Sequence, residues 1–186
     1  MEPEELGIAG VQRFALVPHE DDRGSLTETY RRDWVRGGRD AVQANLSWSR
    51  PGVLRGLHWH RRQADFWCVL TGVAHVALVD LREGSPTRLA TSLFRIATTE
   101  TRYGLAIPPG VAHGFYAETE MFLQYLVDAP YAGDDEFGLA WDDPLAAVPW
   151  PAVDVTDDGR PILSERDRSN PSLEQVLGDP PPYAAR

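Results

Sequence analysis

The stretch from Gly52 to Gly72 holds two histidines, His58 and His60, followed by an acid, Asp65. On an extended strand, successive side chains alternate between the two faces, so both imidazoles should project from the same face. The opposite face would then carry Arg55, Leu57 and Trp59. Imidazoles beside a carboxylate can transfer protons near neutral pH, and they can also bind a transition metal. We expect this stretch to form the floor of an active site, and the residues alone leave both chemistries open.

The length and composition are those of one globular domain. The chain has 186 residues, of which 42% are hydrophobic and 25% are charged, which is enough for a sizeable core. We expect a single domain over residues 1–186. Within it we expect N-terminal strands in residues 1–50, a core barrel in 51–130, and loops with a short helix in 131–186.

Acidic side chains outnumber basic ones, and the formal net charge is −10. This balance argues against nucleic acid or an anionic membrane as a partner, although a local group of arginines can still bind a small anion. All 18 basic residues are arginine, because the sequence contains no lysine. Schiff-base catalysis and a lysine acid or base are therefore excluded.

The chain shows no signal for export or membrane insertion. Its single cysteine, Cys68, lies in an apolar run and allows no disulfide within the chain. The first residues lack the basic and apolar regions of a signal peptide. The longest apolar run, residues 66–79, is too short and too interrupted to span a bilayer. We therefore expect a cytoplasmic protein.

Short strands between Gly and Pro turns must position the chemistry described above. Residues 43–49 alternate, and their polar face could line a cavity or meet solvent. Residues 66–70 and 73–81 predict a hairpin around Gly72, and only residues 172–177 clearly predict a helix. Further strands are expected at residues 11–17, 26–30, 88–96 and 121–127, and residues 105–116 are expected to form two strands joined by a tight turn. Such a pattern favours an antiparallel sandwich or barrel.

Two motifs resemble those of the cupin superfamily. The first is carried by Gly52, His58, His60, Asp65 and Gly72, with Asp in place of the usual Glu. The second is carried by Pro108, Gly110 and His113. This resemblance implies an all-β, double-stranded β-helix, the cupin jelly roll, with short peripheral helices.

Eight pieces in order resemble the dTDP-4-dehydrorhamnose 3,5-epimerase family, itself a jelly-roll branch. They are residues 22–28, 43–47, 52–58, 79–86, 107–115, 125–131, 138–144 and 163–167. The resemblance implies an isomerase of deoxysugar biosynthesis that acts on a nucleotide-diphospho-4-keto-6-deoxysugar, with dTDP as the expected nucleotide. It would epimerise C3, C5 or both, without a cofactor, by removing a proton next to the ketone and returning one on the opposite face. It also implies a homodimer that exchanges N-terminal strands.

The same resemblance assigns roles to individual residues. His58 would be the base, Asp167 would orient its imidazole, and Tyr125 would be the acid that reprotonates the sugar. Tyr131 would line the sugar pocket and His113 would lie near the sugar. The nucleotide and diphosphate would be held by Arg23, Glu28, Gln43, Asn45, Arg55 and Arg166. Arginine suits that role because its planar guanidinium binds phosphate oxygens in pairs.

The chain also departs from this family. Asp65 stands where the family has a lysine that stabilises the enolate oxygen, and His60 stands where it usually has Gln. Loss of such a stabilising group typically costs about 3 kcal/mol of barrier. The same two changes restore a cupin set of possible metal ligands, namely His58, His60, Asp65 and His113, for a divalent transition metal.

Three functions therefore remain open. The first is the epimerase, and the second is a metal-dependent cupin isomerase or oxygenase. A metal on His58 would conflict with that residue acting as a base. The third is a non-catalytic sugar-nucleotide binder. In the simplest alternative to a metal, His60 makes ordinary hydrogen bonds and Asp65 pairs with Arg61 or Arg62.

Overall fold

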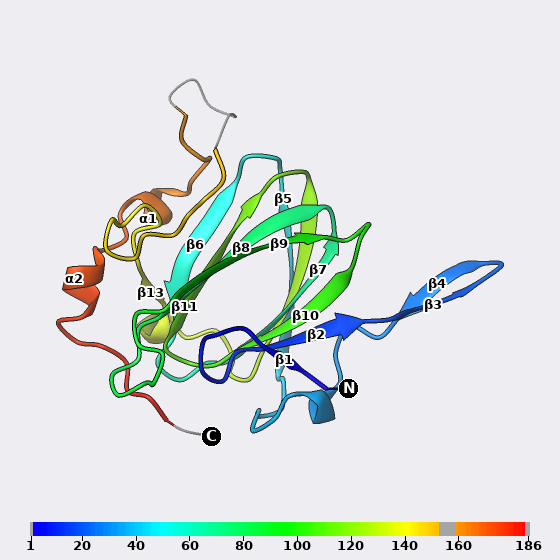
Figure 1. The fold of residues 1–186 in the computed structure, drawn as a ribbon, viewed down its shortest axis with the longest axis horizontal. Coiled ribbons are helices and arrows are strands. Elements are labelled where there is room, and N and C mark those ends of the chain that lie inside the picture. Colours follow the sequence, from blue (N-terminus) through cyan, green and yellow to red (C-terminus); the bar gives the residue numbers. More distant parts are fainter. Residues whose placement is uncertain (1, 153–158, 185–186) are drawn as a thin grey trace.

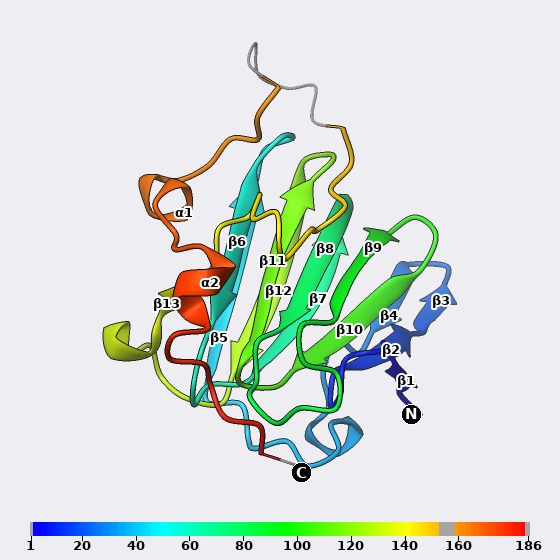
Figure 2. The same cartoon turned by 60° about the vertical axis from the view of Figure 1, so that its left-hand side comes forward.

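Two antiparallel β-sheets face each other in the computed structural model, which describes residues 2–152 and 159–184. One sheet has six strands in the order β1-β2-β10-β7-β12-β5, and the other has five in the order β13-β6-β11-β8-β9. Figures 1 and 2 show the two sheets curving around a common interior. This is the expected jelly-roll barrel, so the predicted fold class is confirmed.

Both sheets combine strands from distant parts of the chain. The six-stranded sheet contains β1 (Glu4–Glu5), β2 (Gln12–Leu16), β10 (Arg102–Ile107), β7 (Asp65–Thr71), β12 (Met121–Val127) and β5 (Gln43–Ser49). The five-stranded sheet contains β13 (Phe137–Gly138), β6 (Leu54–Trp59), β11 (Val111–Ala117), β8 (Val73–Asp80) and β9 (Thr91–Ala97). Strands β5 and β12 match the predicted ranges 43–49 and 121–127.

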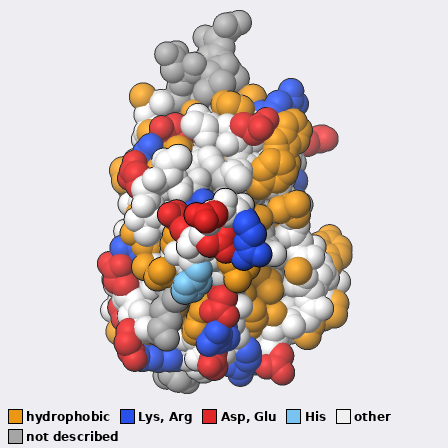
Figure 3. Space-filling view, turned by 90° about the vertical axis from the view of Figure 1, so that its right-hand side faces the viewer, with side chains coloured by type: hydrophobic (Ala, Val, Ile, Leu, Met, Phe, Trp, Pro, Cys, Tyr) orange, Lys and Arg blue, Asp and Glu red, His pale blue; other side chains and the backbone are white. Residues whose placement is uncertain are grey.

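A hairpin formed by β3 (Pro18–Asp21) and β4 (Gly24–Thr27) extends away from the barrel as a separate arm (Figure 1). Figure 3 views the side on which this arm projects, where hydrophobic side chains are interspersed with charged ones. Leu26 on the arm is 71% exposed. A two-stranded hairpin is only marginally stable by itself.

Within residues 2–152 and 159–184, four short helical segments lie outside the barrel strands. They are η1 (Arg32–Trp34), η2 (Gly133–Asp135), α1 (Glu165–Arg168) and α2 (Leu173–Val176). The predicted helix near residue 172 is present, because Ser172 and Gln175 form a reciprocal capping box. The helix α1 was not expected, although Ser164 caps it through the backbone N–H of Asp167. None of the helices among the described residues is long and apolar enough to cross a membrane.

The hydrophobic core lies between the sheets and on both of their outer faces. The interior cluster includes Val69, Val76 and Phe115 from both sheets. Outside the five-stranded sheet, Leu57 and Trp59 pack with the apolar side chains of α2. The outer face of the six-stranded sheet is covered where Trp34 of η1 packs among its side chains. Because both barrel walls are packed on each side, the residues on the inner walls are held firmly.

The predicted hairpin around Gly72 is wrong. Strand β7 pairs with β10 and β12 in one sheet, whereas β8 pairs with β11 and β9 in the other. The chain crosses between sheets at Gly72, which has a φ of 89°. Both strands are nearly continuous apolar runs, and such runs show that a strand is buried without showing which strand it pairs with.

Replacing Gly72 by alanine is expected to destabilise the fold by about 3 kcal/mol or more. An alanine at this position would have to adopt the left-handed backbone of Gly72, which is strained for a residue with a Cβ. The added Cβ would also overlap the carbonyl oxygen of Glu120 and would lie 2.8 Å from the Cβ of Met121. Gly84 is a matched control, because its φ is 80° and nothing lies within 4 Å of the position that an added Cβ would take. Gly84→Ala should therefore cost only about 1–2 kcal/mol in urea unfolding. Equal losses for the two variants would contradict this account.

The predicted alternation along β6 also fails at one position. Arg55 and His58 both line a cavity between the two sheets, whereas Leu57 and Trp59 point to the hydrophobic cluster outside the five-stranded sheet. In the pairing with β11, His58 lies opposite His113 and Arg55 lies opposite Phe115, so β6 contains one extra residue. This β-bulge lies at Gly56, whose φ is 132°, and it shifts the alternation by one residue.

Candidate active site

A cavity of about 300 Å³, here called the site cavity, opens between the two sheets. The five-stranded sheet contributes His58 and His113 to its lining, and the six-stranded sheet contributes Asp65 and Tyr125. Further lining residues are Ser47, Arg55, His60, Gln63, Trp67, Phe115, Leu123, Tyr131, Glu136 and Arg166. Most of the residues to which the sequence assigned chemistry therefore meet in one place.

The His58–Asp167 pair lies on the wall formed by β6. The Nε2 atom of His58 is 2.6 Å from the Oδ1 atom of Asp167, although 109 residues separate them in the sequence. Helix α1 positions the carboxylate, since Ser164 accepts a hydrogen bond from the backbone N–H of Asp167. With Nε2 directed to a carboxylate, the other ring nitrogen of His58 keeps a lone pair that can accept a proton.

Burial alone would raise the pKa of Asp167. The hydrogen bond from His58, the positive charge of a protonated His58, and the hydrogen bonds from Ser164 and the backbone outweigh burial, so the pKa of Asp167 lies below its usual value. The side chain is 5% exposed, and the imidazole of His58 is 26% exposed. Asp167 is therefore a carboxylate over the physiological pH range, and it can accept a hydrogen bond from His58 throughout that range.

The lowered pKa of Asp167 predicts how stability depends on pH. Such a group stabilises the fold above its unfolded pKa, about 3.9, and this contribution is lost as the pH falls through the lower folded value. We expect Asp167→Asn to be less stable than wild type at pH 7, and the difference should shrink below about pH 4. Urea unfolding between those pH values tests this. A difference that stays constant with pH would contradict the assignment.

Tyr125 lies on the opposite wall from His58. It belongs to β12 in the six-stranded sheet, where it pairs with Asn45 on one side and Trp67 on the other. Burial, together with the negative charges of Asp65 and Glu136, raises the pKa of Tyr125. The phenol is therefore protonated at neutral pH and can donate its proton into the cavity.

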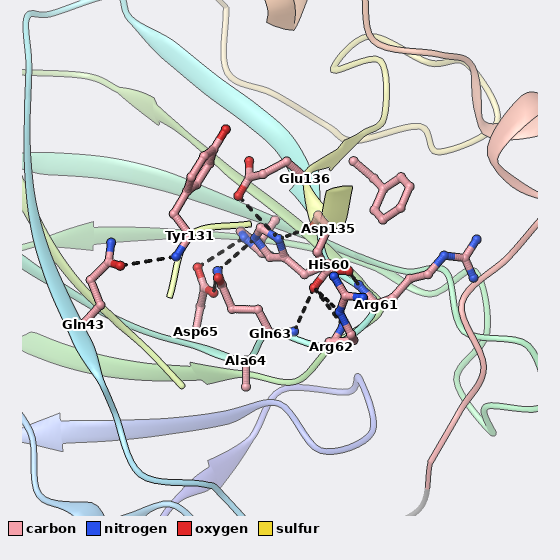
Figure 4. Close-up of polar contacts among 12 residues, drawn as sticks. Gln43, His60, Arg61, Arg62, Gln63, Ala64, Asp65, Tyr131, Asp135 and Glu136 are labelled. Atoms are coloured by element: carbon pink, nitrogen blue, oxygen red, sulfur yellow. Dashed lines mark hydrogen bonds and ion pairs between the residues drawn. The ribbon is translucent and has the colours of Figure 1, made fainter. Parts of the chain in front are cut away.

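His60, Asp65 and His113 form a buried cluster, shown in part in Figure 4. The Nδ1 atom of His60 is 2.7 Å from the backbone oxygen of Asp135. The Nδ1 atom of His113 is 2.9 Å from the backbone oxygen of Val111, and its Nε2 atom is 3.5 Å from a carboxylate oxygen of Asp65. Burial lowers the pKa of His113 to about 4, against the opposing charge of Asp65.

Asp65 has uncharged hydrogen-bond donors around it. Gln63 donates to its Oδ1 atom at 2.8 Å, and the indole N–H of Trp67 donates to its Oδ2 atom at 3.1 Å. The alternative pairing of Asp65 with a neighbouring arginine is not present. Arg61 instead pairs with Asp179, and Arg62 pairs with Asp134.

The loop of residues 61–63 is fixed by Asp135, a residue that the sequence did not single out. The carboxylate of Asp135 accepts hydrogen bonds from the backbone N–H groups of Arg61, Arg62 and Gln63 at 2.9, 3.1 and 3.3 Å. Figure 4 shows these bonds converging on one side chain. Asp135 lies in an acid-rich loop, and nothing in the sequence pattern distinguishes it from its neighbours.

The predicted substrate-binding residues fall into three groups. Arg55, His113, Tyr131 and Arg166 line the site cavity. Gln43 and Asn45 lie beside it on β5, where the amide of Gln43 donates to the oxygen of Asn45 and its own oxygen accepts from the backbone N–H of Tyr131. Glu136 also lines the cavity and binds Arg166 at 2.9 Å, and it was not predicted.

Arg23 and Glu28 are not brought to the cavity within one chain. Arg23 lies at the tip of the projecting hairpin and pairs with Asp21. Glu28 follows that hairpin and pairs with Arg31.

The predicted metal set is divided by the structure. His60, Asp65 and His113 each offer a ligand atom within 4.8 Å of the others. His58 lies outside this group and binds Asp167 instead. His58 and Asp167 thus form a proton-transfer pair that is distinct from the possible cation site of His60, Asp65 and His113.

The chain is similar in sequence to known epimerases. The sequence pattern of the dTDP-4-dehydrorhamnose 3,5-epimerase family matches residues 5–175. The dTDP-4-dehydrorhamnose 3,5-epimerase of Mycobacterium tuberculosis is 36% identical over 186 residues, which cover 95% of this chain and 89% of that protein.

Solved structures show the same similarity in three dimensions. The RmlC epimerase of Mycobacterium tuberculosis superposes with a TM-score of 0.90 at 33% identity, covering 98% of this chain and 94% of that one. ChmJ, a 3′-monoepimerase from Streptomyces bikiniensis solved with dTDP-quinovose, superposes with a TM-score of 0.85 at 31% identity, covering 100% and 94%.

Proposed function

Because the chain belongs to the dTDP-4-dehydrorhamnose 3,5-epimerase family, we propose that it epimerises a dTDP-linked 4-keto-6-deoxysugar at C3, C5 or both. The observation that carries this proposal is the placement of the His58–Asp167 pair and Tyr125 on opposite walls of one cavity. The proposal includes a cytoplasmic location, as the sequence predicts.

Epimerisation needs a base on one face of the sugar and an acid on the other. A hydrogen next to a ketone is acidic because the resulting enolate shares its charge with the ketone oxygen. His58 would remove that proton, with the imidazolium stabilised by Asp167. Tyr125 would then return a proton from the opposite wall and so invert the carbon. These proton transfers use side chains of this chain alone.

The charges at the cavity suit a nucleotide diphosphate. Arg55 lines the cavity and is fixed by a hydrogen bond from its Nε atom to the hydroxyl of Ser49 at 3.0 Å. Arg166 lines another part of the cavity, where Glu136 holds it. Two guanidinium groups can bind the phosphate oxygens in pairs and leave the sugar near His58 and Tyr125.

Solvent exchange tests the proposed reaction directly. The protein would be incubated in D₂O with a dTDP-4-keto-6-deoxyhexose, and C3 and C5 would be followed by NMR. We expect deuterium at one or both carbons, together with inversion. Binding of dTDP without any exchange across several such sugars would overturn the proposal and favour the non-catalytic binder.

The proposal also includes a homodimer in which each hairpin completes the other subunit's site. The hairpin carries Arg23 away from its own cavity, and its Leu26 is exposed. Strand β5 forms one edge of the six-stranded sheet, and Leu46 and Trp48 on it are 64% and 48% exposed. An apolar sheet edge and an unsupported hairpin are features that pairing between subunits would satisfy.

Mixing two inactive variants tests this arrangement. Arg23→Ala and His58→Asn should each be impaired alone, because each removes one part of every site. If Arg23 of the partner subunit completes the site, mixed dimers contain one intact site, and randomly exchanged subunits should recover roughly a quarter of wild-type activity. Sedimentation would verify that dimers form and exchange. Dimers that exchange without any recovery of activity would contradict the shared site.

A further inference from the structure

Three electron-pair donors meet on the wall of the site cavity. His60, Asp65 and His113 are 5%, 6% and 4% exposed, and one ligand atom from each lies within 4.8 Å of the others. All three line the cavity, so a small ion can reach them. Figure 4 shows His60 and Asp65 directed toward each other, with Arg61 and Arg62 directed away.

The backbone fixes which ring nitrogen of each histidine is available. A carbonyl oxygen can only accept a hydrogen bond, so Nδ1 of His60 donates to Asp135 and Nδ1 of His113 donates to Val111. In a neutral imidazole the Nε2 atom then keeps its lone pair. This arrangement, in which the second ring nitrogen donates to a backbone carbonyl, is typical of histidines that bind metals.

The charge of Asp65 is not balanced by a cationic side chain. Among the residues that the structure describes, its one ion-pair partner is His113, whose Nε2 atom is 3.5 Å away. Its other partners are the neutral amide of Gln63 and the indole of Trp67. A buried carboxylate facing two imidazole lone pairs is a site that lacks positive charge.

We propose that His60, Asp65 and His113 bind one divalent transition-metal cation, with His58 outside the set. Two imidazoles and one carboxylate suit iron, manganese, zinc or nickel. Three protein ligands also leave coordination positions open toward the cavity, as in catalytic sites. The side-chain amide of Gln63 donates to Asp65 and lies 3.3 Å from the Nε2 atom of His60, so it holds these two ligands together and would turn away when a cation takes its place.

This assignment removes the conflict that the sequence raised. A metal bound by His58 would occupy the proposed base, whereas the structure leaves that imidazole with Asp167. A catalytic role for the cation rests on the proposed function. It would supply positive charge beside the sugar's ketone oxygen, at the place where the family resemblance implies a lysine and this chain has Asp65.

Direct metal binding, measured without any sugar, tests the proposal. The full-length protein would be purified without a histidine tag, stripped with a chelator, and titrated separately with Co²⁺ by visible absorption and with Zn²⁺ by calorimetry. We expect about one equivalent to bind to the wild type. His60→Gln and Asp65→Asn should each weaken binding by at least ~100-fold.

Two variants serve as matched controls. His58→Asn should bind the metal within about twofold of wild type, because His58 lies outside the set. His75→Asn should also bind the metal normally. It changes a histidine of β8 that pairs with Glu118. Thermal unfolding of the stripped proteins would show that each variant is folded. Asp65→Asn keeps the size of the side chain, so it tests the site even if His60→Gln fails to fold.

Each result has a defined meaning. Wild type that binds no stoichiometric metal, or His60→Gln and Asp65→Asn variants that bind as well as wild type, would overturn the site. Loss of binding in His58→Asn would overturn the exclusion of His58. If the metal does not bind but solvent exchange persists, only this inference fails. If the metal binds and the loaded protein shows no exchange with any sugar, the proposed function fails instead.

Discussion

His58→Asn is expected to lower kcat for epimerisation by about 10³-fold, within the range of about 10²–10⁴-fold that a positioned acid or base contributes. The amide of asparagine cannot accept a proton from carbon near neutral pH. It is similar in size to part of the imidazole, so the packing on Asp167 should change little. The measurement is the rate of deuterium entry at C3 and C5, recorded at saturating substrate.

The same variant should bind dTDP within about twofold of wild type, because the proposed phosphate contacts come from other residues. His75→Asn is the matched control for the loss of a histidine, and it should keep full activity because His75 binds Glu118 away from the cavity lining. A folded His58→Asn protein that retains more than about a tenth of wild-type kcat would show that another group removes the proton.

Tyr125→Phe is expected to separate proton exchange from inversion. His58 would still remove the proton and could return deuterium from the same face, so exchange should continue at a rate near that of wild type. Inversion should fall by about 10²–10³-fold, because no donor would remain at the position of the phenol on the opposite wall. The two rates can be read from the same NMR experiment, one as loss of the proton signal and the other as formation of the epimer.

Phe122 provides the matched control for a change of aromatic side chain on β12. It lies on the same strand but outside the cavity lining, and Phe122→Tyr should leave both rates unchanged. An equal fall of exchange and inversion in Tyr125→Phe would indicate that Tyr125 positions the substrate and does not donate the proton. If neither rate changes, Tyr125 has no role in the reaction.

Local patterns predicted individual strands well. The alternation of residues 43–49 and the apolar run of residues 121–127 correspond to β5 and β12 without any shift. The same patterns could not show that β7 and β8 belong to different sheets. Neighbours in a sheet are set by packing across the whole barrel, and a continuous apolar run fits either arrangement.

The site was predictable to different degrees for different residues. The spacing of His58, His60 and Asp65 was enough to predict that these residues lie in one active site, without help from any relative. The partnership of His58 with Asp167 spans 109 residues, and only the family resemblance brought it forward. The predicted strand face of Arg55 was wrong, because a β-bulge at Gly56 changes the face of every residue before it in β6. That bulge depends on the pairing with strand β11.

The hydrogen bonds of Asp135 have a consequence for protein engineering. Its carboxylate ties the backbone of residues 61–63 to the loop that contains η2, so the two loops form one mechanical unit. A transplant that moves residues 60–65 alone into a relative would leave three amide donors without their acceptor. When site residues are transplanted between members of this family, both loops should therefore be transferred together, including Asp135.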